Sequence, residues 1–306
     1  MIKPILTFYS SDIVAHIGAH ISPSSVKPEF IANALISNNI PVSFIEPHPV
    51  TVDDFNLAHD PEFVRDILSG ARENGFGNKS LDVSRSLPYT SGAMLGAARA
   101  ALYGRGPCAA LVSGFHHAGY ANEEGFCTFN GLMVTAMVLL KNLEASKIAI
   151  IDADYHYGNG TDNIITKLGV TNSIFHYSFG HDFHSPLDAD AYLEKMKSLR
   201  GDLKQFKPDV ILYQAGADAH EYDPLGGVLS THGLYERDLT MFKIADELRI
   251  PICWDLAGGY QRDADGGISV VTEIHLNTFK ASLVVQTLKQ PFTTKVLSGF
   301  SRLMGR

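Results

Sequence analysis

One short segment of the chain ends an apolar run in residues that can bind a metal ion. Residues 148–151 are apolar and mostly β-branched, and the run is too short for a helix, so it predicts a buried strand of a parallel sheet. Asp152, Asp154 and His156 follow, and then two glycines. Alternate residues of an extended chain point the same way. Asp154 and His156 therefore present an oxygen and a nitrogen on one face, which is half of a metal site.

Other predicted strands also end in residues with chemical potential. These residues are His116-His117 after residues 108–113, Asp218 after residues 209–214, and Gly258-Gly259-Tyr260 after residues 251–256. A parallel sheet brings the carboxyl ends of its strands to one edge, which is where ligands bind in open α/β folds. We therefore expect these side chains to meet.

The residue types at that edge predict a catalytic metal centre. Asp154, His156 and Asp218 would supply three ligands and leave one position open, which is the pattern of catalytic zinc. Two carboxylates and one imidazole form a harder ligand set than most zinc sites, so Fe²⁺ is an alternative. Asp218-Ala219-His220 is a second Asp-x-His. The residues alone leave open whether Asp218, His220 or both bind metal, and whether one or two ions are bound.

The neighbouring residues suit general acid–base chemistry. His116 and His117 would supply a neutral base and a second imidazole that tunes charge. Asp152 and Asn159 could orient these two rings. The Tyr260 hydroxyl follows two glycines and could donate to a developing oxyanion.

The rest of the chain alternates predicted strands and helices, which is typical of an α/β fold with helices on both faces of a mostly parallel sheet. We expect about eight strands and one domain over residues 1–306. Further strands are expected at 5–9, 42–45 and 172–178, and helices at 28–37, from residue 61, and at 91–103, 131–143, 193–205, 233–249 and 268–288. Residues 10–29 and 70–80 are expected to be loops, the second of them exposed.

Composition narrows the class of protein. The formal net charge is −8 and there is no Lys/Arg run, which argues against a nucleic-acid surface and is compatible with a cationic substrate. No apolar run is long enough to span a membrane. The three cysteines are widely spaced, and the first residues do not resemble a signal peptide, so a cytoplasmic protein is expected. A homo-oligomer is compatible with the sequence.

Taken together, these motifs resemble those of the zinc-dependent histone deacetylase and acetylpolyamine amidohydrolase superfamily, which has an arginase-like α/β fold. The matching segments are His116-His117-Ala118, Gly125-Phe126-Cys127-x-Phe129-Asn130, Asp152-x-Asp154-x-His156-x-Gly158-Asn159-Gly160-Thr161, Ala215-Gly216-x-Asp218-Ala219-His220-x-x-Asp223-Pro224-Leu225-Gly226 and Gly258-Gly259-Tyr260. They occur in the family's order and spacing over most of the chain. The chain resembles bacterial-type members, with some class IV features.

The resemblance implies a role for each matched residue. It assigns zinc to Asp154, His156 and Asp218, with His220 as a neighbour. It implies that His117 paired with Asn159 is the general base and acid, that His116 paired with Asp152 is its electrostatic partner, and that Tyr260 polarises the carbonyl. The expected acyl-lysine channel is formed by Gly125, Phe126 and Phe183. A structural K⁺ site would use Asp152, Ser178 and the backbone carbonyls of Asp154 and His156.

Two positions depart from the family pattern: the first concerns local packing and the second concerns the substrate. Tyr157 stands where many members have a second histidine, and Phe115 precedes the histidine pair where many have glycine. The Ser-Gly-Phe-His-His form is similar to the class IV branch, so a longer acyl chain is an alternative to acetyl.

Three functions are compared. The first is a deacylase acting on acyl-lysine in proteins or peptides, or on an acylated polyamine. The second is an arginase-type ureohydrolase with two manganese ions, which Asn159 disfavours because a carboxylate would be wanted there. The third is a non-catalytic acyl-lysine reader, which would be expected to have lost ligands or the histidine pair.

Overall fold

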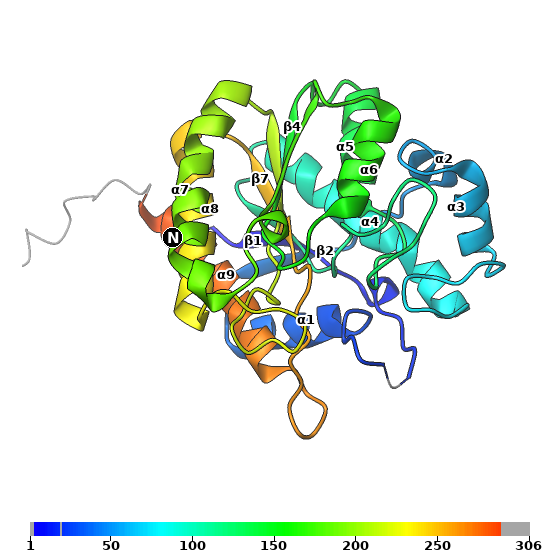
Figure 1. Cartoon of the computed structure of the whole chain (residues 1–306), viewed down its shortest axis with the longest axis horizontal. Coiled ribbons are helices and arrows are strands. Elements are labelled where there is room, and N and C mark those ends of the chain that lie inside the picture. Colours follow the sequence, from blue (N-terminus) through cyan, green and yellow to red (C-terminus); the bar gives the residue numbers. More distant parts are fainter. Residues whose placement is uncertain (1–2, 19, 289–306) are drawn as a thin grey trace, which may run out of the picture.

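A single parallel sheet organises the molecule (Figure 1). The computed structural model describes residues 3–18 and 20–288, and within them the sheet has seven strands in the order β2-β1-β3-β7-β6-β4-β5. The strands are β1 (Ile5–Phe8), β2 (Val42–Ile45), β3 (Cys108–Ala110), β4 (Ile148–Asp152), β5 (Ile174–Ser178), β6 (Val210–Gln214) and β7 (Ile252–Asp255). This confirms the predicted α/β class. About eight strands were expected, and the described residues form seven.

The register of the sheet places the polar strand ends level with one another. Asp152 at the end of β4 pairs with Ser178 of β5 on one side and with Gln214 of β6 on the other. Gln214 in turn pairs with Asp255 of β7. All neighbouring strands run parallel, so the segments that follow them leave the sheet at the same edge.

Helices cover both faces of the sheet because the strands are apolar on both sides. Figure 1 shows one layer to the left and below the sheet, and another to the right. The first layer is α1 (Lys27–Ser37), α7 (Ala189–Phe206), α8 (Thr231–Leu248) and α9 (Ser269–Leu288), and its apolar side chains pack with Ala149 and Ile151. The second is α4 (Leu81–Leu102), α5 (Gly131–Lys141) and α6 (Asn159–Leu168), packed with Ile148 and Ile150.

Two short helices lie outside these layers: α2 (Val52–Phe55) and α3 (Pro61–Leu68). Helix α3 begins as predicted, with the Asp60 carboxylate accepting from the backbone N–H groups of Glu62 and Phe63. Single 3₁₀ turns occur at Ser11–Ile13, Phe179–His181 and Pro186–Asp188. None of the described helices is long and apolar enough to cross a membrane.

The largest departure from the sequence prediction is the start of α4. A helix was expected from residue 91, but it begins at Leu81 and contains Pro88 in its interior. Proline removes one helical hydrogen bond. Burial of residues on both sides of it, including Leu87 before it and Met94 after it, compensates for that loss.

The loop at residues 70–80 is irregular as predicted but is not wholly exposed. Asn74 is buried, and the backbone N–H of Gly75 donates to the Thr128 hydroxyl at 3.0 Å. The loop therefore folds back onto the segment that carries Phe126. The predicted single domain includes residues 1–2, 19 and 289–306, which lie outside the described residues.

Candidate active site

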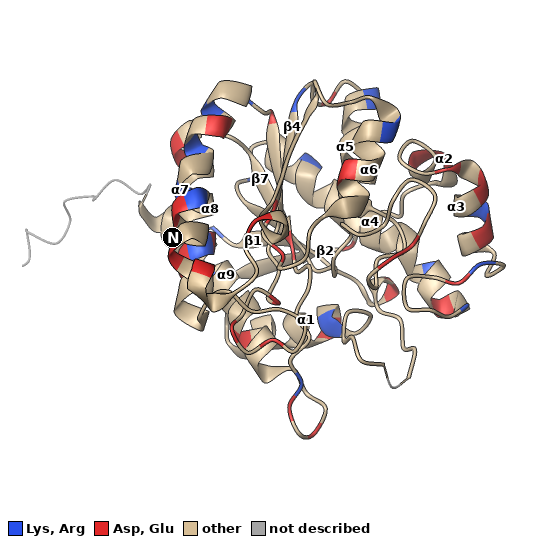
Figure 2. Cartoon of the chain, in the orientation of Figure 1, with Lys and Arg blue, Asp and Glu red and all other residues tan. Residues whose placement is uncertain are grey.

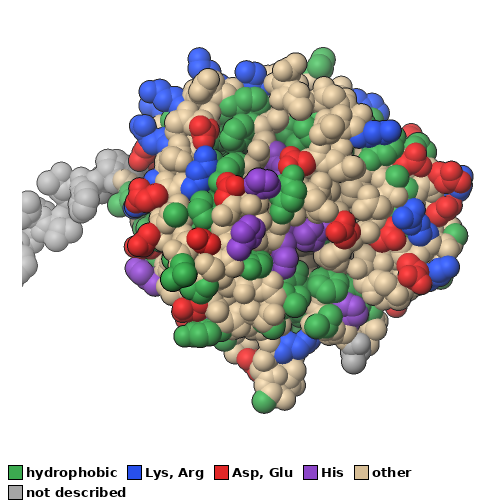
Figure 3. All heavy atoms as spheres, in the orientation of Figure 1, with side chains coloured by type: hydrophobic (Ala, Val, Ile, Leu, Met, Phe, Trp, Pro, Cys, Tyr) green, Lys and Arg blue, Asp and Glu red, His purple; other side chains and the backbone are tan. Residues whose placement is uncertain are grey.

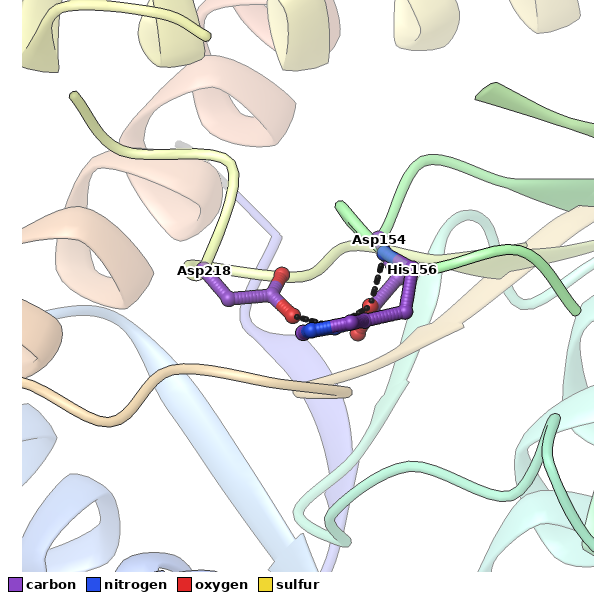
Figure 4. Close-up of side chains that lie close together, drawn as sticks. All are labelled: Asp154, His156 and Asp218. Carbon is purple, nitrogen blue, oxygen red and sulfur yellow. Dashed lines mark hydrogen bonds and ion pairs between the residues drawn. The ribbon is translucent and has the colours of Figure 1, made fainter. Parts of the chain in front are cut away.

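Three side chains converge at the carboxyl edge of the sheet (Figure 4). Asp154 and His156 follow β4, and Asp218 follows β6, which lies beside it. The Nδ1 atom of His156 lies 3.0 Å from Oδ2 of Asp218 and 3.3 Å from Oδ1 of Asp154. One potential ligand atom from each residue lies within 4.8 Å of the other two.

The electrostatics of this group favour a cation between the carboxylates. Asp154 and Asp218 are both almost fully buried. Burial, and then the neighbouring Asp154 carboxylate, raises the pKa of Asp218 to about 7. Burial lowers the pKa of His156, but its hydrogen bonds to Asp154 and Asp218 outweigh burial and raise the pKa to about 11. Two buried acids so close together require a positive charge between them, and a divalent ion fits that requirement and the donor set.

Backbone groups hold the two carboxylates in place. The N–H of Gly258 donates to Oδ2 of Asp154 at 2.7 Å, and the N–H of Tyr155 donates to Oδ1 of Asp218 at 3.1 Å. A Cβ atom on Gly258 would lie 2.2 Å from Oδ2 of Asp218, so only glycine allows this approach. The buried Arg237 guanidinium donates to the carbonyls of Ala153 (3.0 Å) and Gly216 (2.7 Å), which ties the ends of β4 and β6 together.

The histidine pair lies beside this group, and each imidazole has its own partner. Nδ1 of His116 lies 2.8 Å from Oδ2 of Asp152, and Nδ1 of His117 lies 2.7 Å from Oδ1 of Asn159. Because an amide oxygen can only accept, Nδ1 of His117 carries the proton and Nε2 is free. The two rings lie 4.0 Å apart, centroid to centroid.

The two histidines differ in their protonation. Burial lowers the pKa of His116, but the carboxylates of Asp152 and Asp154 outweigh it and raise the pKa to about 9. Burial, and then the charge on His116, lowers the pKa of His117 to about 4. At neutral pH the structure therefore pairs a charged imidazole with a neutral one.

Two of the residues expected at a potassium site, Asp152 and Ser178, also lie together. The Ser178 hydroxyl donates to Oδ2 of Asp152 at 3.2 Å and accepts from the backbone N–H of Gly158 at 2.9 Å. Oδ1 of Asp152 accepts from the side-chain amide of Gln214 at 2.9 Å.

Tyr260 is held by contacts that the sequence did not suggest. Its backbone N–H donates to Oδ2 of Asp223 at 2.7 Å, and burial raises the pKa of its phenol well above the usual value. Just before it, Ala257 and Gly259 have positive φ angles of 46° and 133°. The ammonium of Lys27 donates to the carbonyls of Ala257 and Gly258.

Lys27 is the clearest residue that sequence reasoning missed. It is fully buried, and burial lowers its pKa to about 8, even though nearby carboxylates oppose that shift. A lysine ahead of Pro28 at a predicted helix start usually lies at the surface, so the sequence carried no signal for it. Asp223 lay within a motif but had no assigned role.

Two adjoining cavities lie next to these residues. The first, of about 10 Å³, is lined by His116, Asp154, Gly258 and Tyr260. The second, of about 50 Å³, is mainly apolar. Ser24, Gly114 and Phe126 line both. The ring of Phe126 lies 5.6 Å from that of Tyr260, 5.4 Å from that of His20 and 6.2 Å from that of Phe76. Through His20 and Phe76, the segments 10–29 and 70–80 both lie next to the cavity wall at Phe126.

Phe183, which was predicted to line the channel, and His220, the alternative metal ligand, have other neighbours. The ring of Phe183 lies 5.9 Å from Phe179 and 5.3 Å from Tyr192. Nε2 of His220 lies 3.0 Å from the Thr231 hydroxyl, and His220 is not in the cluster of potential ligands.

Histidine side chains gather near the middle of the face in Figure 3, next to acidic side chains. Figure 2 shows Asp and Glu residues at the lower end of β4, whereas Lys and Arg lie mainly on the outer helices.

The sequence matches a family model described as "Histone deacetylase domain" over residues 22–186 and 182–274, so the chain belongs to the histone deacetylase family. It is 30% identical over 180 residues to "Histone deacetylase 2" of Arabidopsis thaliana, covering 52% of this chain and 46% of that protein. It is 33% identical over 162 residues to "Acetoin utilization protein AcuC" of Staphylococcus aureus, covering 44% and 41%. The matched region thus spans less than half the length of either relative.

Two solved structures share the fold. The chain superimposes on the HDA15 HD domain with a TM-score of 0.76 at 18% identity, covering 92% of this chain and 90% of that one. It superimposes on acetylpolyamine aminohydrolase from Burkholderia pseudomallei with a TM-score of 0.71 at 17% identity, covering 92% and 99%. The described residues therefore have the fold of these two proteins.

Proposed function

We propose that the chain is a metal-dependent amide hydrolase that removes an acyl group, in the simplest case acetyl, from the side-chain nitrogen of lysine or from a related amine. The observation that carries the proposal is the convergence of Asp154, His156 and Asp218, whose potential ligand atoms lie within 4.8 Å of one another. The neutral ring of His117 lies beside them, 5.7 Å from that of His156 between centroids. Family membership supports the same reaction class. We propose one catalytic domain over residues 1–306.

We propose that Asp154, His156 and Asp218 hold one Zn²⁺ ion, with Fe²⁺ as the alternative. When bound, such an ion lowers the pKa of water and polarises a carbonyl oxygen. Among the described residues, these three form the one cluster of that kind. That supports a mononuclear site over an arginase-type pair of ions. We also propose that Asp152 and Ser178, with the carbonyls of Asp154 and His156, hold a structural K⁺ ion.

His117 is proposed to move the proton. Its Nδ1–H is engaged by Asn159, so Nε2 can accept a proton from the attacking water and later donate it to the leaving amine. A pKa of about 4 keeps the imidazole neutral, and therefore able to accept, at physiological pH. The charged His116, fixed by Asp152, stabilises the negative charge that develops next to it.

Tyr260 is proposed to stabilise the oxyanion. The raised pKa keeps its hydroxyl protonated and able to donate. Lys27 holds the carbonyls of Ala257 and Gly258, and Asp223 holds the backbone N–H of Tyr260. The backbone is therefore fixed on both sides of Gly259. A non-catalytic reader would not need this machinery, so its presence supports the hydrolase.

The apolar cavity supports acyl groups longer than acetyl as a second candidate. An acyl carbon chain whose carbonyl lies near Tyr260 would continue past Phe126, which lines both cavities. A volume of about 50 Å³ is room for roughly four water molecules, or for a few methylene groups. We propose that the channel wall is formed by Gly125 and Phe126 together with Phe183.

Acylated polyamines are an alternative substrate that suits the net charge of −8. The three unpaired, buried cysteines support a cytoplasmic location.

A turnover panel tests the proposal. The purified chain is offered acetyl-lysine peptides, lysine peptides with longer acyl groups, and acetylpolyamines, each with and without a chelator. We expect hydrolysis of at least one class, abolished by the chelator and restored by Zn²⁺ or Fe²⁺. Absence of turnover across the whole panel with metal supplied would refute the proposed function.

A further inference from the structure

We propose that Glu124 is a positioning residue for His117 and acts through Asn159. The inference rests on the proposed function only in taking His117 as the general base. It adds a residue that lies outside the histidine pair and its immediate partners, and it explains why position 159 is an amide and not a carboxylate.

The amide of Asn159 bridges the two residues. Its oxygen lies 2.7 Å from Nδ1 of His117, and its Nδ2 donates to Oε2 of Glu124 at 3.1 Å. An amide has one accepting end and one donating end. If it turned over, its oxygen would face the Glu124 carboxylate and its NH₂ would face His117. Glu124 therefore selects the orientation in which Asn159 accepts from Nδ1, and this keeps the proton off Nε2 of His117.

The backbone fixes where Glu124 lies. Its N–H donates to the carbonyl of Cys127 at 3.1 Å, and the N–H of Cys127 donates back to the carbonyl of Glu124 at 2.8 Å. The turn between them has Gly125 and Phe126 at positive φ angles of 53° and 64°. A Cβ atom on Gly125 would lie 2.3 Å from Cδ2 of His117. The turn that carries Glu124 is thus packed directly against the ring that Glu124 helps to orient.

The same geometry predicts a dependence between positions 124 and 159. An aspartate at position 159 could still accept from His117, but its second oxygen would face the Glu124 carboxylate at hydrogen-bond distance. Like charges so close together repel. A glutamine at position 124 would remove that conflict, because its NH₂ can donate to the aspartate. It would also preserve the bond to the native Asn159, because its oxygen can accept.

The test is a set of four variants with kcat and KM measured on the best substrate. Glu124→Ala should lower kcat about fivefold with little change in KM, since one hydrogen bond to a charged group is lost at an exposed position. Glu124→Gln should stay within about twofold of wild type. Asn159→Asp should lose about tenfold or more, and Asn159→Asp combined with Glu124→Gln should recover most of that loss. A general structural role would not produce this rescue.

Glu123→Gln is the matched control, because it removes the same charge one residue away, where the partner is Arg72 at 2.9 Å. We expect its kcat to be unchanged. Unchanged kcat in Glu124→Ala, or no rescue of Asn159→Asp by Glu124→Gln, would overturn the inference. ¹⁵N NMR of the His117 ring provides a readout independent of turnover: Glu124→Ala should mix the two tautomers, and a single unchanged tautomer would also overturn it. A wild-type chain without turnover would refute the proposed function alone, and the NMR result would still decide the role of Glu124.

Discussion

Replacing Lys27 with methionine should destabilise the fold strongly, although its ammonium donates to backbone carbonyls and not to a proposed metal ligand. Its ammonium donates to the carbonyls of Ala257 and Gly258 and is the buried cation beneath a group of acids. Those acids are Asp154, Asp218, Asp223 and Asp255. Methionine fills a similar volume but leaves the carbonyls without a donor and the acids without that charge. Removing one partner from a buried charged group costs about 3–5 kcal/mol, so we expect a loss of that size in the free energy of unfolding.

The pH dependence of that loss is a sharper test of the burial of Lys27. Burial lowers the pKa of Lys27 from 10.5 to about 8. Between these values the unfolded chain holds a proton that the folded chain has released, so this group makes stability rise with pH. Denaturant unfolding of wild type and Lys27→Met at several pH values should show the difference growing by roughly 2 kcal/mol from about pH 7.5 to about pH 9.5. A constant or shrinking difference would show that burial does not outweigh the carboxylates around Lys27.

Three further predictions concern single residues. Tyr260→Phe should keep its metal but lose about 10²- to 10³-fold in kcat, measured by metal content and steady-state kinetics; full activity would refute the assigned role. Gly125→Ala should lower kcat about 10- to 100-fold with metal content intact, because the new Cβ would lie 2.3 Å from the His117 ring. A wild-type kcat in this variant would contradict the proposed packing of residue 125 against His117. Burial lowers the pKa of His59 to about 4. On acidification from about pH 7 to about pH 4, wild type should therefore lose roughly 3 kcal/mol more stability than His59→Asn, measured by denaturant unfolding. An equal loss of stability in the two proteins would contradict the burial of a neutral His59.

The sequence predicted the placement of the strand ends well, for a physical reason. A buried parallel strand is an unbroken apolar run, so the polar residues after it mark the edge of the sheet. Because β4 and β6 are neighbours, Asp154, His156 and Asp218 meet as that reasoning expected. The sequence alone could not choose between Asp218 and His220, since only the turn after β6 decides which side chain faces β4.

Other features depend on tertiary contacts that no local pattern encodes. A proline usually marks the end of a helix, but at Pro88 the burial of α4 on both sides overrides that signal. The burial of Lys27 depends on carboxylates that lie 127 to 228 residues further along the chain, from Asp154 to Asp255. The contact between Glu124 and Asn159 depends on a turn whose positive φ at Phe126 is unusual for a bulky residue.

A metal titration of the stripped protein tests most directly whether the chain binds one catalytic ion. The chain is freed of metal with a chelator and titrated with Zn²⁺, and in parallel with Fe²⁺ and Mn²⁺, while turnover of the best acyl substrate is followed. We expect activity to return in proportion to bound metal and to reach its maximum at one ion per chain. We expect Asp218→Asn neither to bind the ion tightly nor to recover activity. Full turnover without metal, a maximum at two ions per chain, or wild-type recovery in Asp218→Asn would contradict this expectation.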